Sequence, residues 1–543
     1  MIPASGNRLW IDSVTDFHRV APFFEHDHRL EALGQVSPTE RHRPLSASDM
    51  EALVSFNIRP FSDAKVVRSL VERLADPECQ VILTGQQAGL LLGPLYTVLK
   101  AMHAIRLARH LEETTGRPAV AIFWIASEDH DFEEVNHVTW LDSAGQRRRF
   151  ELPLPAGYEG HSVGPMPLDC EALESLLDTL AKTTPETEFR ALLFDAMRES
   201  QNTSEALGEL FLDQLLRLLQ PQGLIAVDPW FAPIKEMLKR VCRWEIENPG
   251  ASTALVLETS KRLQAAGYTP QIHRREGDIN LFLFVEGVRC RLETRDGDFL
   301  ALHPGSGETL ARLSARDLLE RLESRPELFS PNVVTKPLVR DAVFLPVAYV
   351  AGPGEMAYHA QLRALYGHHG IAMPAIVPRV QGVLVSPPIQ RALRKLGLTA
   401  EEWLTMPSER RSEHIARQGI GGKALESFDA LRRSVSDRMS ELSESIVSFD
   451  PGLRRSAERA VRGLEGGLER LAEQMTQSAQ RRDEKLATAA SRVEEALTPG
   501  GQPQERCDNL FIPHLLMHGP GLVERLLSDL RLDAPGPQVF EIH

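Results

Sequence analysis

Five short apolar runs, separated by long stretches of different character, constrain the fold of this chain more than any other feature. Each run is the length of a strand and lacks polar alternation, which is typical of strands buried on both faces of a sheet. They are QVILT at 80–84, AVAIFWIA at 119–126, GLIAVD at 223–228, VFLPVAYVA at 343–351 and IAMPAIVP at 371–378. A helical apolar pattern from about 95 to 113 separates the first two, which predicts a βαβ unit and a parallel α/β sheet.

Two long stretches interrupt this rhythm and are interpreted as insertions between sheet strands. Residues 145–220 are mixed in pattern and mostly helical toward their end. Residues 250–325 contain a hairpin-like pair, NLFLFVEGVRCRLE, with Gly287 near the bend. We therefore expect an α/β core over residues 1–390 that carries both insertions.

The strand signals stop after about residue 390, and the pattern becomes helical. Apolar residues at spacings of three and four run from Phe428 to Ile446, and SFDPGL then starts a new helix that is expected to reach about Leu497. At ~1.5 Å per residue that helix would be about 70 Å long, which predicts a coiled-coil domain at 391–505. The tail at 506–543 is expected to pack back on the core.

The coiled coil also predicts a homodimer. Its second helix has an apolar seam at Leu464, Leu468, Leu471 and Met475, and a partner chain normally buries such a seam. Intramolecular pairing with the helix before Asp450 is the alternative. That helix spans only about half the length, so it would leave part of the seam uncovered.

Composition disfavours several classes of protein. The chain has 543 residues, 42% of them apolar, and a net charge of −14, which disfavours nucleic acid as a partner. It has no apolar run of about 18 residues, so no membrane span is expected. The start, MIPASGNRLWIDSV, lacks the pattern of a secretory signal. Five scattered cysteines without a CxxC pair indicate reduced thiols, a cytoplasmic protein and no thiolate zinc site.

The stretch TGQQAGLLLGPLYTVLK at 84–100 has more glycine and glutamine than a turn requires. It follows the first strand, where the loops of a doubly wound sheet face the ligand crevice. Gly85, Gly89 and Gly93 allow the backbone to approach a ligand closely. Gln86 and Gln87 can donate and accept hydrogen bonds, and the helix start offers free amides to an anion. The pattern is neither GxGxxG nor GxxxxGK[ST], and a packing turn is the alternative interpretation.

The stretch SEDHDFEEVNH at 127–137 follows the second strand and gathers ionisable groups. Crowded carboxylates and a histidine such as His130 can exchange protons near neutral pH, which predicts acid–base or substrate-binding chemistry. A divalent metal site is an alternative, although no HExxH or comparable ligand spacing occurs. A solvated helix start is a third interpretation, which suits Glu133 and Glu134 better than His130.

A third candidate begins with SPNVVTKPLVRD at 330–341 and continues through the fourth apolar run into GPGEMAYHAQL. Lys336 and Arg340 can neutralise phosphate or carboxylate groups, although such residues are more often solvated surface charges. Gly352 and Gly354 form another tight loop at a strand end, and Glu355 opens the next helix. Three loops that converge on one sheet edge indicate a ligand pocket.

Together these motifs resemble the bacillithiol biosynthesis cysteine-adding enzyme family, a family of cysteine ligases. The resemblance rests on TGQQAGLLLGPLYTVLKAMHAIRLA, FWIASEDHDFEEVNHV, SPNVVTKPLVRD and AYVAGPGEMAYHAQL in that order, and on GGQPQER near the C-terminus. The chain departs from the family pattern at Ala88 and Leu92, which replace a proline and a glycine, and at Lys336, where an arginine is expected. These departures bear on the contacts to substrate.

The resemblance implies a Rossmann-like core related to class I nucleotidyltransferases, with two insertions and a coiled coil that pairs two chains. It implies that cysteine is joined through an amide bond to glucosaminyl-malate, which completes bacillithiol. It also implies ATP for activating the carboxylate, with Mg²⁺ compatible with the nucleotide and no resident metal. The expected catalytic residues are then Asp129, His130 and Gln86, with the first two as the base for the amine. Arg506 is the expected contact to the nucleotide.

The resemblance further implies a set of substrate-binding residues from all of these motifs. They are Thr84, Gly85, Gln87, Gly89, Gly93, Tyr96, Glu128, Asp131, Asn136, Asn332, Lys336, Gly352, Gly354 and Glu355. Two other functions stay open. One is a nucleotidyltransferase-like enzyme that acts on another amine or acid, and the other is a non-catalytic assembly protein whose coiled coil is the functional part.

Overall fold

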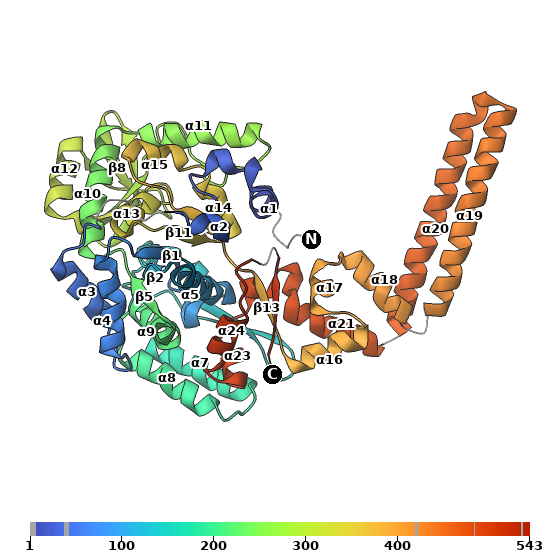
Figure 1. The fold of residues 1–543 in the computed structure, drawn as a ribbon, viewed down its shortest axis with the longest axis horizontal. Coiled ribbons are helices and arrows are strands. Elements are labelled where there is room, and N and C mark those ends of the chain that lie inside the picture. The colour runs from blue at the N-terminus through green and yellow to red at the C-terminus, as the bar shows by residue number, and fades with distance from the viewer. Residues whose placement is uncertain (1–6, 37–42, 419–421, 483, 534–535, 543) are drawn as a thin grey trace. The chain divides into compact units, whose positions relative to one another are not determined.

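A five-stranded sheet forms the centre of the larger of two structural units (Figure 1). The structure is a computed structural model that describes residues 7–36, 43–418, 422–482, 484–533 and 536–542. The larger unit comprises residues 1–383 and 504–540, and the smaller unit comprises residues 384–503 and 541–543. The boundary between the units passes through β13 (Gly382–Val385) and β14 (Gln538–Glu541).

The strands of this sheet are all parallel and correspond to the five apolar runs. In spatial order they are β12 (Ala375–Pro378), β11 (Ala348–Ala351), β1 (Gln80–Gln86), β2 (Ala119–Ile125) and β5 (Leu224–Val227). The predicted parallel sheet is therefore confirmed. The run at 343–351 differs at its start, because Val343 and Phe344 end α13 (Lys336–Phe344). Pro346 cannot continue a helix, and the strand begins only beyond it.

Helix α5 (Leu95–Thr115) connects β1 to β2 and packs against both strands (Figure 1). It ends at Gly116, which adopts a left-handed conformation with φ of 70°. Val81 and Leu83 of β1 belong to a buried cluster with Leu238 of α10 (Ala232–Glu247) and Leu338 of α13. Both faces of the sheet are therefore covered, which explains why its strands are apolar without alternation.

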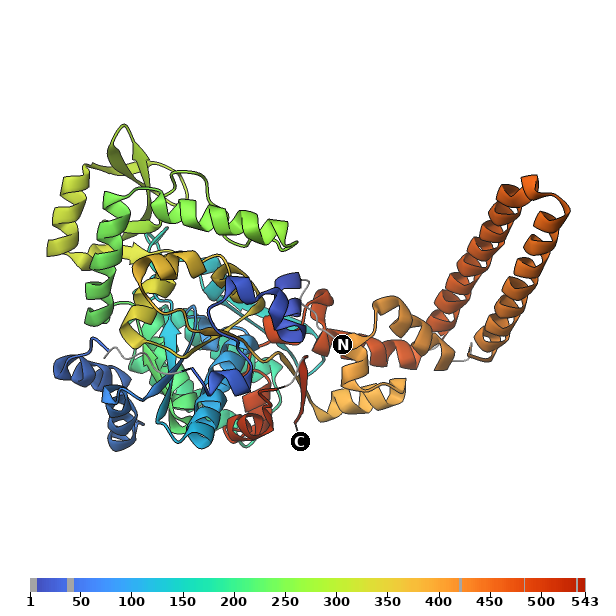
Figure 2. The same cartoon turned by 45° about the horizontal axis from the view of Figure 1, so that its top comes forward.

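Both predicted insertions are present in the larger unit, which Figure 2 shows from a second side. The first contains β3 (His137–Leu141), β4 (Arg147–Glu151), α7 (Cys170–Thr183), α8 (Arg190–Asn202) and α9 (Leu207–Leu219). The second contains α11 (Ala251–Ala265), β6 (Leu281–Val285), β7 (Val288–Arg295), β8 (Asp298–Leu302), β9 (Thr309–Leu313), α12 (Ala315–Ser324) and β10 (Phe329–Pro331). The predicted hairpin is β6 and β7, whose turn residues Glu286 and Gly287 have φ of 50° and 87°.

Shorter elements complete the larger unit. They are α1 (Arg8–Thr15), α2 (Leu30–Leu33), α3 (Ala47–Asn57), α4 (Ala64–Glu72), α6 (Phe132–Val135), α14 (Pro353–His359), α15 (Arg363–His369), α22 (Gln504–Cys507), α23 (His514–His518) and α24 (Leu522–Asp529). The helices α22 to α24 come from the C-terminal tail, which belongs to the same unit as the sheet.

The smaller unit is helical and contains the predicted coiled coil. Helices α19 (Gly422–Phe449) and α20 (Arg454–Arg482) form a hairpin and lie side by side in Figures 1 and 2. The remaining helices are α16 (Pro387–Leu396), α17 (Ala400–Thr405), α18 (Ser408–Gln418) and α21 (Glu484–Leu497). The second coiled-coil helix was expected to continue to Leu497. Instead α20 is described to Arg482, residue 483 lies outside the described residues, and α21 packs on α16, which gives its apolar residues a separate partner.

Candidate active site

The strand order places a ligand crevice at the carboxyl ends of β1 and β11. The chain passes from β1 to β2 on one side and returns much later to β11 on the other side. Loops that leave adjacent parallel strands in opposite directions open a crevice at such a switch point. A cavity of about 530 Å³ lies there, lined by residues that follow β1, β2 and β11.

Most of the predicted site residues line this one cavity. They are Gly85, Gln86, Gln87, Tyr96, Asp129, His130, Asn332, Lys336, Gly352, Gly354, Glu355 and Arg506. The structure thus brings together all three sequence motifs and a residue of the C-terminal segment.

The two glutamines at the carboxyl end of β1 connect neighbouring parts of the cavity wall. Gln87 donates from Nε2 to Asp129 at 3.1 Å and to Glu134 at 2.9 Å, and Gln86 donates to the Tyr96 hydroxyl at 3.4 Å. The chain can pass close to β2 here because Gly85 has no side chain. A Cβ at Gly85 would lie 2.6 Å from the Trp124 carbonyl oxygen.

The loop that follows is held by the C-terminal segment. Leu91 and Leu92 adopt left-handed conformations with φ of 50° and 67°, which are unfavourable for leucine. Asn509 donates from Nδ2 to the carbonyl oxygens of Leu91 and Gly93, at 2.5 and 2.8 Å. The amide of Leu95 donates to the backbone carbonyl oxygen of Asp508 at 2.7 Å. The sequence analysis expected free amides at this helix start, but the amide of Leu95 is therefore not available to an anion.

A buried ion pair joins the loops after β1 and β11. The side chain of Lys100, on α5, is 1% exposed and lies 2.6 Å from Glu355 Oε2 and 2.6 Å from the Gly85 carbonyl oxygen. Glu355 also accepts the Gly352 amide at 2.7 Å and the Tyr349 hydroxyl at 2.9 Å. Burial would raise the pKa of Glu355, but Lys100 outweighs this effect and lowers it. Glu355 is thus a charged structural partner of Lys100.

Arg289, from the second insertion, organises the acidic motif. Its Nη1 lies 3.5 Å from Asp129 Oδ1 and donates to His130 Nδ1 at 3.3 Å, so the proton of a neutral His130 sits on Nε2. Burial would raise the pKa of Asp129, but Lys336 and Arg289 outweigh it and lower the pKa. Burial lowers the pKa of His130, and Arg289 adds to this effect. At neutral pH the pair is therefore a carboxylate beside a neutral imidazole.

Two cations face the cavity with unused hydrogen-bonding capacity. Within the described residues no hydrogen bond or ion pair of the Lys336 ammonium occurs, and burial lowers its pKa although Asp129 opposes this. Arg340 is 2% exposed and donates from Nε to Asp341 at 2.6 Å, while its buried Nη2 has no partner in the described part of the chain. A buried guanidinium nitrogen without an acceptor indicates a ligand oxygen in this place.

The lining as a whole is positively charged. Among its described residues, the basic side chains are Lys100, Arg274, Arg289, Lys336, Arg340, Arg379 and Arg506, and the acidic ones are Asp129, Glu134 and Glu355. An excess of buried cations over anions in a cleft attracts anionic ligands.

Some predicted site residues have structural roles outside the cavity lining. Thr84 donates its hydroxyl to the Val350 carbonyl oxygen at 3.0 Å, which ties β1 to β11. Glu128 is buried in an ion pair with Lys235, at 2.5 Å, and accepts the Ser330 hydroxyl at 3.0 Å. The sequence motif placed Glu128 next to Asp129, but the chain turns so that the two side chains face different neighbours.

The other predicted residues outside the lining lie in the turns of the same motifs. Asp131 is exposed and accepts the Glu134 amide at 3.3 Å, which caps α6. Asn136 donates to the Leu152 carbonyl oxygen at 3.3 Å. Gly89 and Gly93 pack against each other, since a Cβ on Gly89 would lie 2.9 Å from the Gly93 Cα. The interpretation of a packing turn therefore applies to these two glycines.

The sequence analysis missed several lining residues, notably Lys100, Arg289 and Arg379. Lys100 had a local signal, because it is a charged residue in a helix segment whose neighbours Leu99 and Ala101 are fully buried. Arg379 also had one, because it directly follows the fifth apolar run, at the carboxyl end of β12. Arg289 had no such signal, since it lies in β7 of the second insertion, outside the recognised motifs.

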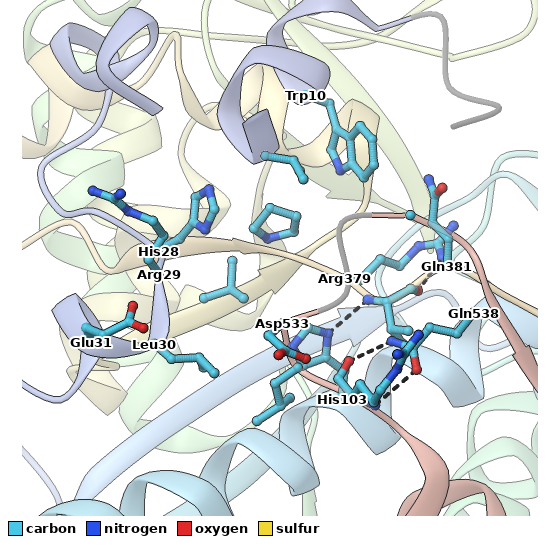
Figure 3. Close-up of a pocket in the computed structure, with 17 residues that line it drawn as sticks. Trp10, His28, Arg29, Leu30, Glu31, His103, Arg379, Gln381, Asp533 and Gln538 are labelled. Atoms are coloured by element: carbon cyan, nitrogen blue, oxygen red, sulfur yellow. Dashed lines mark hydrogen bonds between the residues drawn. The ribbon is translucent and has the colours of Figure 1, made fainter. Parts of the chain in front are cut away.

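A second cavity, of about 260 Å³, is lined by residues that include Arg379 and His103 (Figure 3). Arg379 lines both cavities and is therefore part of the wall between them. Its guanidinium is held by Glu505, with nitrogen–oxygen distances of 2.6 and 2.9 Å. His103 Nδ1 accepts the Val380 amide at 2.9 Å, and burial lowers the pKa of His103 to about 3. This ring therefore stays neutral and positions the segment between β12 and β13, which carries Arg379.

Neither a metal cluster nor a membrane span is found in the parts of the chain that the structure describes. Within these residues no group of three or more histidine, cysteine, aspartate and glutamate side chains is arranged to hold a metal ion. None of the described helices has the length and apolar character needed to cross a bilayer.

Comparisons with known proteins match almost the entire chain. The family model for the bacillithiol biosynthesis BshC N-terminal Rossmann-like domain matches residues 2–380, and that for the BshC C-terminal coiled-coil domain matches residues 382–535. Relatives named "Putative cysteine ligase BshC" include one from Salinibacter ruber, 29% identical over 98% of this chain and 96% of its own length. Others come from Geobacillus thermodenitrificans, 31% identical over 89% and 88%, and Heliobacterium modesticaldum, 33% identical over 84% and 82%.

Proposed function

This chain belongs to the BshC family of bacillithiol biosynthesis, and we propose that it joins cysteine to the amine of glucosaminyl-malate by an amide bond. As a member of this family it is a cysteine ligase. The proposal adds the second substrate and the activation of the cysteine carboxylate with ATP.

The positively charged cavity is the observation that carries this proposal. The malate part of glucosaminyl-malate bears two carboxylates, and the cavity offers Lys336 and the free Nη2 of Arg340 as donors. Charge-assisted hydrogen bonds to carboxylates are strong in a site shielded from water. A neutral sugar or an apolar substrate would leave these cations unpaired. We therefore assign Lys336 and Arg340 to the malate carboxylates.

Asp129 and His130 support a role in preparing the amine. An ammonium cannot attack an acyl group, so it must lose a proton first. Asp129 stays ionised at neutral pH and is suited to hold the ammonium. The neutral His130 can accept a proton at Nδ1 once the hydrogen bond from Arg289 to this atom opens. Gln87 orients Asp129 through a hydrogen bond of 3.1 Å, and the correct placement of reacting groups typically lowers a reaction barrier by several kcal/mol.

The cavity residues are compatible with a nucleotide. Arg506 is exposed at the cavity, with its guanidinium 5.7 Å from the centre of the Tyr96 ring, and an arginine beside an aromatic ring suits phosphate and base. Arg506 would hold the polyphosphate. Bound ATP supplies the driving force that turns a carboxylate into an acyl donor.

A direct assay tests the proposed reaction. Purified protein is incubated with labelled cysteine, ATP and glucosaminyl-malate, and the amide product is followed by mass spectrometry. We expect a product that needs all three compounds. Omission of one compound at a time is the control. ATP consumption with another amine and no reaction of glucosaminyl-malate would instead favour a nucleotidyltransferase-like enzyme.

We further propose that two chains pair through the coiled coil. Helices α19 and α20 pack on each other, yet Leu431, Leu442, Leu464 and Leu471 remain 46–56% exposed. Intramolecular pairing therefore covers only part of the apolar seam, and a second copy of the hairpin suits the remainder.

Replacing both Leu468 and Leu471 with glutamate is expected to convert the dimer to a monomer, because buried charges in a helix interface are strongly unfavourable. Light scattering at micromolar concentration measures the mass in solution. Arg462→Glu is a matched control, since it changes the net charge equally at an exposed position on the same helix. A mass of one chain for the unmutated protein would refute the dimer.

A further inference from the structure

The guanidinium of Arg289 is fixed within the second insertion before it reaches the acidic motif. Arg289 is 4% exposed, and its Cζ lies 3.9 Å from the centre of the Phe282 ring. Its Nε donates to the Ser330 hydroxyl at 3.1 Å, and its Nη2 donates to the Pro331 carbonyl oxygen at 3.0 Å. An arginine carries its N–H donors in one rigid plane, so these two bonds determine where Nη1 points.

Glu128 fixes Ser330 in turn. The Ser330 hydroxyl donates to Glu128 Oε2 at 3.0 Å, and Glu128 Oε1 lies 2.5 Å from Lys235 Nζ. Lys235, Glu128 and Ser330 are all buried, so water does not weaken these contacts. Glu128 does not line the active-site cavity, yet it is connected to the acidic motif through Ser330 and Arg289.

Residues 160–163 of the first insertion join the same two parts of the site through the backbone. The Arg289 amide donates to the Gly160 carbonyl oxygen at 2.9 Å, and the Val163 amide donates to the Asp129 carbonyl oxygen at 2.7 Å. Arg289 and Asp129 are 160 positions apart in the chain. They nevertheless share a backbone framework as well as a contact between their side chains.

We propose that Arg289 is a positioning residue, which holds the Asp129 carboxylate and the His130 ring in one arrangement. Its Nη1 lies 3.5 Å from Asp129 Oδ1 and 3.3 Å from His130 Nδ1, so one nitrogen holds both groups. Ser330 and Glu128 position Arg289 and act through it. The inference rests on the proposed function for the role of His130, which is to accept a proton from the amine.

The place of Arg289 has a consequence for the protonation of His130. Burial and the Arg289 charge lower the pKa of His130, whereas Asp129 and Asp131 of its own loop raise it. Lys336 of α13 acts on the neighbouring Asp129, whose pKa it lowers. Only the neutral ring accepts a proton, and its fraction falls as the pH drops through the pKa. Loss of the Arg289 charge would therefore move this fall to higher pH.

Diethyl pyrocarbonate acylates neutral histidine, so it reports the titration midpoint of His130 without any substrate. The side chain of His130 is 27% exposed, and peptide mass spectrometry after short pulses at a series of pH values measures its acylation rate. We expect Arg289→Met to raise the midpoint by about 1 pH unit and to move the acidic side of the kcat/KM profile equally. Arg289→Lys retains a charge and should reverse at least about half of this shift. Arg291→Met is the matched control, since it removes an exposed charge from the same strand and should leave the midpoint unchanged.

Ser330→Ala tests the second link, because it removes the acceptor of Arg289 Nε without changing any charge. Arg289 should then cover His130 Nδ1 less completely, so acylation above the midpoint should become about 2-fold faster. The same substitution should have no further effect in the Arg289→Met background, because its effect passes through Arg289. Ser324→Ala, at an exposed position on α12, is the control.

Thermal unfolding of each variant establishes that it is folded. A folded Arg289→Met protein with the midpoint of the unmutated protein would overturn the proposal, and so would equal effects of Ser330→Ala with and without Arg289. If Arg289→Met does not fold, Ser330→Ala decides alone, and an unchanged acylation rate overturns the proposal. Expected shifts in acylation without any amide formation by the unmutated protein would support the positioning role and refute the proposed reaction instead.

Discussion

Replacing Asp129 with asparagine is expected to lower kcat/KM for amide formation at least about 100-fold while the protein stays folded. The substitution preserves the shape of the side chain but removes the charge that we assign to holding the substrate ammonium. It also removes the charged partner of Arg289, whose Nη1 lies 3.5 Å from Asp129 Oδ1. Initial rates of amide formation at neutral pH, measured over a range of glucosaminyl-malate concentrations, give the comparison.

Glu133→Gln is the matched control for this variant. Glu133 is an exposed carboxylate in the same motif and does not line the cavity, so its neutralisation should change the rate less than about 2-fold. A folded Asp129→Asn protein with nearly unchanged kcat/KM would exclude the assigned role. A loss caused by misfolding would appear as a lower midpoint of thermal unfolding.

Replacing Lys100 with methionine is expected to lower the free energy of unfolding by about 3–5 kcal/mol. Methionine fills similar space but leaves the Glu355 carboxylate without its partner at 2.6 Å. The pKa of Glu355 should then rise, because burial is no longer opposed by Lys100. The loop carbonyl of Gly85 also loses its donor. Urea unfolding followed by circular dichroism measures the change.

A double-mutant cycle separates the ion pair from general packing. Lys100→Met together with Glu355→Gln removes both charges, so it should cost at least about 1 kcal/mol less than the sum of the two single variants. Lys65→Met, at an exposed position on α4, should change stability by no more than about 0.5 kcal/mol. Additive costs in the cycle would show that the two charges do not stabilise each other.

The parallel sheet was predictable because its signals are local. A strand buried on both faces must be apolar throughout, so each run could be recognised without knowing its neighbours. The hairpin of β6 and β7 was predictable for a similar reason, since the turn at Glu286 and Gly287 requires a residue that tolerates positive φ. The start of β11 was not, because the apolar run continues from α13 across Pro346 and changes its conformation there.

The cavity was predictable in part, because loops at the carboxyl ends of parallel strands meet at one edge. Gln86, Asp129 and Glu355 lie at or beyond the carboxyl ends of three such strands and line the same cavity. Adjacency in sequence was a poorer guide within each motif. Glu128 and Asp129 are neighbours, yet one pairs with Lys235 and the other faces the cavity.

The amino-acid sequence alone determined the strands, the βαβ unit, the family and the three loops that reach the cavity, since all of these depend on residues close together in the chain. Folding in three dimensions set the partners of those loops. Arg289 reaches Asp129 from the second insertion, and Asn509 and Glu505 reach Gly93 and Arg379 from the C-terminal segment. These contacts join residues that are far apart in the chain, so no local sequence pattern predicts them. Burial strengthens them by excluding water, and burial is itself a result of the tertiary structure.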